Sequence, residues 1–190
     1  MSSWGATDAD ESKPKFLTDA EKKLVFANSS GWVLEAGSAF SGNDNVNATP
    51  EVLVAIGDLT TSLGAADITE VEFVLTSFSK GAGGNMDMLV RFNEAVDVTG
   101  TPQFLITNNT SSARNITCNY FSGTGTNELT FRKVLGAAAN ATNANDVLKV
   151  VANPVSLNGG TIKDAGTNTA STITSAVAIG TAAGTLTVAA

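Results

Sequence analysis

Short apolar segments alternate with glycine, asparagine and serine along the later part of the chain. Residues 86–93 are the clearest case, because Met86, Met88, Val90 and Phe92 occupy every second position. Successive side chains of a strand point to opposite faces of a sheet. A period of two therefore predicts a half-buried strand here.

The same rhythm continues on both sides of that strand. Residues 114–121 place Ile116, Cys118 and Tyr120 on one face, which predicts a buried cysteine. Many short strands separated by turns are typical of an all-β sandwich or barrel. The other segments with strand character are residues 71–79, 103–107, 129–134, 147–152, 155–157, 172–179 and 185–188.

A helix start precedes these strands. Thr18 and Glu21 have the spacing of a capping box, in which each side chain accepts a hydrogen bond from a free backbone N–H of the first turn. The pattern predicts a short helix over residues 19–28. Such a helix is too short to be stable alone, so its apolar side, with Leu24 and Phe26, must dock on this chain or on a partner.

Two apolar segments around a loop rich in Asn, Gly and Ser follow the helix. Residues 32–34 and 52–56 predict the two strands of a hairpin, and Trp32 is expected to pack within its own fold. Residues 59–67 are predicted to be a loop or a short helix, because Thr and Gly lower the helix propensity there.

Charge and composition then remove several classes of function. The chain of 190 residues has a formal net charge of −7, so a nucleic-acid backbone or an anionic membrane surface would repel it on average. It has no histidine, which excludes Ser-His-Asp and Cys-His catalysis, and one cysteine cannot build a thiolate zinc site. The single cysteine also fits assembly in a reducing cytoplasm. We expect no enzyme, and neither a nucleic-acid nor a membrane partner.

Calcium is the one ligand that the sequence leaves open. Asn43, Asn45 and Asn47 alternate like the ligands of an EF-hand loop, although the central glycine and the final glutamate of such a loop are missing. The alternative is an ordinary Asn-rich turn, in which the side chains bond to nearby backbone. We expect no cofactor, with calcium at this loop as the alternative.

Three further segments occur in a characteristic order. They are residues 92–102 (FNEAVDVTGTP), 120–131 (YFSGTGTNELTF) and 157–166 (LNGGTIKDAG). Together they resemble the opening signature, the middle hairpin and the late turn of a bacterial and phage immunoglobulin-like repeat family with a cadherin-like sandwich. The resemblance implies an immunoglobulin-like antiparallel β-sandwich. The family commonly has Asn directly after Asp-Ala-Gly in the late turn, whereas Thr167 intervenes here, so no metal role is transferred to Asp164 or Asn168.

The N-terminal segment also resembles a known group. Residues 4–18 (WGATDADESKPKFLT) are similar to the opening of virion proteins of large marine tailed phages that infect cyanobacteria. This resemblance implies a component of the head surface, neck or tail. A small acidic sandwich behind an arm looks most like a capsid decoration, or cement, protein that stabilises the shell from the head exterior. The alternative is a tail, neck or fibre component whose immunoglobulin-like domain acts as a spacer or binds glycans.

The expected organisation has three parts: an N-terminal arm with one short helix (1–35), a hairpin and connecting region (36–70), and the sandwich with C-terminal strands (71–190). The expected location is the capsid surface of the virion, after assembly in the host cytoplasm. The implied partners are the major capsid protein, other virion proteins, or sister copies in a homo-oligomer. Because large apolar side chains contribute most when a partner covers them, the candidate interface residues of the arm are Trp4, Phe16, Leu24 and Phe26.

Overall fold

The computed structural model describes residues 13–137 and 142–190, and it is mainly β, with 45% strand and 10% helix. The mainly β prediction is therefore confirmed. The prediction of one short helix is wrong, because the described residues contain three α-helices: α1 (Asp19–Lys23), α2 (Leu59–Ser62) and α3 (Val177–Ala182). Helix α2 lies in residues 59–67, where a loop or a short helix was predicted. Each of the three helices is at most two turns long, so strand pairing dominates the architecture.

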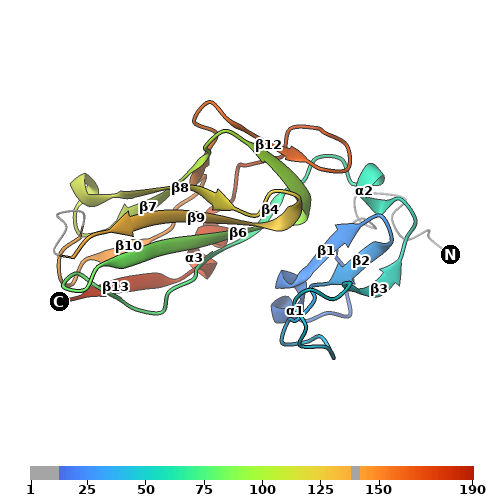
Figure 1. Cartoon of the computed structure of the whole chain (residues 1–190), viewed down its shortest axis with the longest axis horizontal. Helices are drawn as coiled ribbons and strands as arrows, with labels where there is room; N and C mark the ends of the chain where they lie inside the picture. The colour runs from blue at the N-terminus through green and yellow to red at the C-terminus, as the bar shows by residue number, and fades with distance from the viewer. Residues whose placement is uncertain (1–12, 138–141) are drawn as a thin grey trace.

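Three strands near the N-terminus form a small antiparallel sheet, which we call the N-terminal sheet: β1 (Val25–Asn28), β2 (Gly31–Leu34) and β3 (Glu51–Ala55). The predicted hairpin of residues 32–34 and 52–56 corresponds to β2 and β3. In Figure 1 this sheet lies beside α1 and α2, at one end of the molecule. It has its own apolar cluster, built from Val25, Ala27, Trp32, Leu34 and Leu59.

Helix α1 begins as predicted and ends earlier than predicted. The Thr18 backbone N–H donates to a Glu21 carboxylate oxygen at 2.7 Å, and the Glu21 backbone N–H donates to the Thr18 hydroxyl at 3.3 Å, so the capping box is confirmed. The helix ends at Lys23 instead of continuing to residue 28. Residues 25–28 form β1 because their backbone groups pair with β2, from which only a tight turn separates them.

The later strands form the body of the molecule, which surrounds the larger apolar core. Strand β6 (Gly84–Thr99) runs through this body for 16 residues and pairs with β4 (Ile68–Phe73), β9 (Thr126–Leu135) and β12 (Thr161–Asp164). The remaining strands of the body are β5 (Phe78–Ser79), β7 (Gln103–Asn108), β8 (Ile116–Ser122), β10 (Val147–Lys149), β11 (Val155–Ser156) and β13 (Thr185–Ala189).

The predicted face of β6 is buried. Met86, Met88 and Val90 are fully buried and Phe92 is 1% exposed, as the period of two requires. Residues from β6 and from β13 belong to one apolar cluster, although the strand path between them runs through β9, β8, β7 and β10. The sheet therefore curves around its core, as the strands in Figure 1 show.

The buried cysteine is also confirmed. Cys118 is fully buried on β8, and burial raises the pKa of its thiol to about 12, with Asp87 adding to the effect.

Two strand pairings depart from the purely antiparallel arrangement that the resemblance implies. Strand β13 runs parallel to β5, and β1 runs parallel to β6 at the pair Ala27 and Glu94.

The C-terminal region follows the prediction only in part. Residues 185–188 lie in β13, which pairs with β10 of the same chain. Residues 172–179 were expected to form a strand, but helix α3 begins at Val177. Gly180 explains the close packing of this helix, because a Cβ there would lie 2.8 Å from the Val150 carbonyl oxygen.

Candidate functional site

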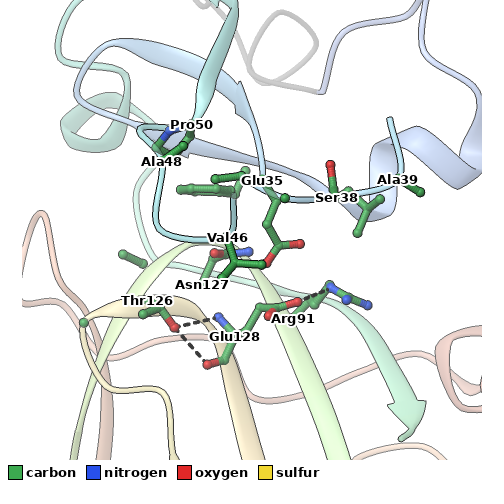
Figure 2. A pocket seen from close by; sticks show the side chains of 16 residues that line it. Glu35, Ser38, Ala39, Val46, Ala48, Pro50, Arg91, Thr126, Asn127 and Glu128 are labelled. Carbon is green, nitrogen blue, oxygen red and sulfur yellow. Dashed lines mark hydrogen bonds and ion pairs between the residues drawn. The ribbon is translucent and has the colours of Figure 1, made fainter. Parts of the chain in front are cut away.

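A pocket lined by described residues lies between the N-terminal sheet and the body. Its volume is about 720 Å³. One wall is the loop between β2 and β3, with Leu24 and Phe26 beside it, and the opposite wall comes from β6 and β9 (Figure 2). The pocket therefore lies between the two parts of the chain, and no buried residue of either apolar cluster lines it.

The loop between β2 and β3 is folded on its own backbone. Gly37 has a φ of +71°, and a Cβ there would lie 2.6 Å from a Val46 methyl carbon, so glycine is required. The side-chain oxygen of Asn43 accepts the Asn45 backbone N–H, and that of Asn45 accepts the Asn47 backbone N–H, both at 3.0 Å. These bonds are those of an Asn-rich turn. Across residues 13–137 and 142–190, no group of three His, Cys, Asp or Glu side chains is arranged to hold a metal ion.

Arg91 is the centre of the charged groups at the base of this pocket. Its side chain is only 12% exposed, and one guanidinium nitrogen donates to Glu70 at 3.1 Å and to Glu72 at 2.9 Å. Its Nε donates to Glu128 at 2.5 Å (Figure 2). Burial alone would lower the pKa of Arg91, but the neighbouring carboxylates, Glu128 first, outweigh it and raise that pKa.

Glu35 brings a further carboxyl group to the same place from the end of β2. Figure 2 shows its side chain pointing across the pocket towards Glu128 and Arg91. The two glutamates are within hydrogen-bonding reach of each other. Partial burial raises the pKa of Glu35 to about 7, and the charge and the hydrogen bond of Glu128 add to this, against the opposing effect of Arg91. Glu35 is thus the group at this site that changes its charge near neutral pH.

A second ionic cluster has a structural role. Asp146 is 1% exposed and accepts two hydrogen bonds from Arg114 at 2.7 and 2.8 Å. The side chain of Asn108 and the backbone of Asn143 donate to the same carboxylate. These bonds, the Arg114 bond above all, hold the pKa of Asp146 well below its usual range. The cluster fixes the segment before β10 against the end of β7.

The candidate interface residues lie in different surroundings. Phe16 is 68% exposed just before α1, whereas Leu24 packs partly on the small apolar cluster and Phe26 lines the pocket. Trp4 lies outside the described residues. Three further large apolar side chains between residues 36 and 55 are exposed: Phe40 (48%), Val46 (71%) and Val52 (47%). Large apolar side chains are therefore exposed at Phe16 and between residues 40 and 52 of this segment. Others are exposed on the body, for example Val134 (67%).

Trp32, in contrast, is 1% exposed inside its own sheet, as expected.

Two carboxylates that lie close together in the sequence, Glu94 and Asp97, lie on opposite faces of β6 in the structure. Glu94 is 1% exposed beside β1, whereas Asp97 is exposed, because residues three apart on a strand face opposite sides. They do not form an acid–base pair.

Sequence patterns missed the charged residues of the pocket. Arg91, Glu35 and Glu128 come from three strands or strand ends that are far apart in the chain. One signal was present: Arg91 is a charged residue within the apolar run of β6. A charge on the outward face of such a strand needs partners on the neighbouring strands, and Glu128 lies directly opposite it on β9.

Replacing Arg91 by Met should lower the free energy of unfolding by about 2–3 kcal/mol, because Glu128 then loses its paired cation and Glu70 keeps only Lys23. Urea unfolding followed by circular dichroism measures this loss. The matched variant Arg132→Met removes an arginine whose paired carboxylate is Asp87. Its loss should be clearly smaller, and equal losses would show that Arg91 is not the centre of the cluster.

Comparison with known proteins does not assign the chain to a family. No known protein family, curated protein or solved structure matches the chain. Within the part of the chain that the structure describes, no helix has both the length and the apolar character needed to cross a membrane.

Proposed function

We propose that this chain is a non-enzymatic structural protein of a tailed-phage particle, most specifically a decoration protein that stabilises the capsid shell from outside. The resemblance of residues 4–18 to phage virion proteins supports the particle, and the immunoglobulin-like resemblance of three later segments supports the fold type. The mainly β structure agrees with such a fold at the level of strand content. The body is then an immunoglobulin-like sandwich.

The observation that carries this proposal is the exposure of apolar side chains along the N-terminal part. Phe16, Phe40, Val46 and Val52 are between 47% and 71% exposed, on a segment whose own apolar cluster is small. Exposed phenylalanine and valine lose unfavourable contact with water when a partner covers them. The segment from Phe16 to β3 is the proposed contact with the major capsid protein or another virion protein, and the body projects away from it.

The proposal is tested by adding the purified chain to phage heads that lack it. The chain should bind at on the order of hundreds of copies per head, as a repeated shell contact requires, and should raise the temperature at which heads release their DNA. Replacing Phe16 by Ser should weaken binding about thirtyfold, the equivalent of an interface residue contributing about 2 kcal/mol. Sedimentation of heads with bound chain, quantified by mass spectrometry, gives both the copy number and the affinity.

Phe121→Ser is the matched control. Phe121 is 54% exposed on β8 of the body, so the variant removes a similar side chain away from the proposed contact. Its binding should stay within about twofold of the unmodified chain. Equal weakening by both variants would contradict the N-terminal contact, and binding at a few copies at the tail or neck would replace the decoration role with that of a spacer or fibre component.

A further inference from the structure

The N-terminal sheet is attached to the body through a small set of polar and backbone contacts. Strand β1 meets β6 at the pair Ala27 and Glu94, and Lys23 at the end of α1 forms an ion pair with Glu70 of β4 at 2.6 Å. At the pocket, Glu35 faces Glu128 of β9. The apolar clusters on the two sides are separate, so these polar and backbone contacts contribute to holding the two parts together.

The charged groups around Arg91 do not balance. In the described part of the chain, four carboxylates surround Arg91, namely Glu35, Glu70, Glu72 and Glu128. The cations that face them are Arg91 itself, Lys23, and Lys13, which interacts electrostatically with both Glu70 and Arg91. Burial lowers the pKa of Lys13 to about 8, so it is charged at neutral pH. One negative charge is thus left without a partner when all these groups are ionised. A single proton removes that excess.

We propose that Glu35 and Glu128 form a proton-dependent latch, in which one shared proton joins the two carboxyl groups and holds the N-terminal sheet against β6 and β9. Loss of that proton leaves two carboxylates facing each other across the pocket and loosens the sheet. Glu35 is the member that gains and loses the proton, since Glu128 is already bonded to the Arg91 guanidinium. The latch concerns the chain itself and does not depend on the shell-binding proposal.

The direction of the pH dependence follows from Glu35. Its pKa is raised to about 7 in the folded chain from an ordinary value of 4.5, so the attached state binds the proton more tightly than the detached state does. The contribution of the latch is fully present below about pH 4.5 and is lost as the pH rises through 7. The N-terminal sheet should therefore be firmly attached in mildly acidic solution and loosened in mildly alkaline solution.

Hydrogen exchange followed by mass spectrometry on the full chain tests the latch. After correction for the intrinsic pH dependence of exchange, protection of peptides covering β1 to β3 should fall about tenfold between about pH 5.5 and pH 7.5, a reduced effect because Glu35 is only half buried. The range ends at about pH 7.5 because burial lowers the pKa of Lys13 to about 8. Peptides from the buried half of β6 should change little. In Glu35→Gln, which cannot ionise, the protection seen at about pH 5.5 should persist at about pH 7.5.

The matched control is Glu51→Gln, which neutralises an exposed glutamate of β3 and should keep the unmodified pH dependence. If Glu35→Gln retained the same fall in protection, the latch would be wrong. A carbon-13 NMR titration of the unmodified chain provides a test that needs no variant. A Glu35 carboxyl titrating near pH 7 supports the latch, and one titrating near 4.5 overturns it.

Discussion

Replacing Trp32 by Ala should unfold the N-terminal sheet while the body stays folded. Trp32 is the largest side chain of the small apolar cluster and is 1% exposed. Removing a buried tryptophan costs about 3–5 kcal/mol, which a three-stranded sheet with so few buried residues has little means to offset. Hydrogen exchange should show loss of protection in β1 to β3, with protection in β6 and β9 retained.

Trp32→Phe separates packing from any other role of this position. It keeps an aromatic ring and should cost much less than Trp32→Ala. If Trp32→Ala destabilised the body as strongly as the N-terminal sheet, the two apolar clusters would form one cooperative unit. Under the proposed function, Trp32→Ala should also lose binding to phage heads, because Val52 and its neighbours would no longer be presented by a folded sheet.

Replacing Phe131 by Ala should destabilise the body by about 3–5 kcal/mol. Phe131 is fully buried on β9, and its ring lies 5.8 Å from that of Phe104 and 6.2 Å from that of Tyr120, measured between centroids. The cavity left by the ring cannot close easily, because β9 is paired on both sides, with β6 and with β8. Chemical unfolding followed by circular dichroism measures the loss.

Phe121→Ala is the matched control on the neighbouring strand. Phe121 is 54% exposed, and the guanidinium carbon of Arg132 lies 3.9 Å from its ring centroid. An exposed contact of this kind contributes about 0.5–1 kcal/mol, so this variant should be only slightly less stable than the unmodified chain. A loss close to that of Phe131→Ala would indicate that exposure does not govern the cost of losing a ring in this body.

The strands that could be predicted from sequence are those with one buried and one exposed face. Alternation at Met86 to Phe92 and around Cys118 reflects burial directly, because water on one face of the sheet selects polar residues at every second position. The start of α1 was predictable for a similar reason. Its capping bonds join residues only three positions apart.

The failures occurred where distant pairing or close packing decides the local structure. Residues 25–28 continue an apparent helical pattern, and only their pairing with Gly31–Leu34 makes them a strand. Residues 177–182 have strand-like composition, but they pack as a helix against the Val150 carbonyl group, where Gly180 allows the approach. The pocket was hidden for the same reason, because Glu35, Arg91 and Glu128 meet only after β2, β6 and β9 have been brought together.

The long strand β6 also has a consequence for the order of events during synthesis. The pairing among β1, β2 and β3 is complete once residue 55 has left the ribosome, whereas β6 still lacks β9 and then β12, whose residues end at Asp164. Pairing over long sequence separations forms slowly because more loop entropy must be lost first. The N-terminal sheet is therefore expected to fold first on the ribosome, and the body to close later around β6, when Glu128 arrives opposite an already positioned Glu35.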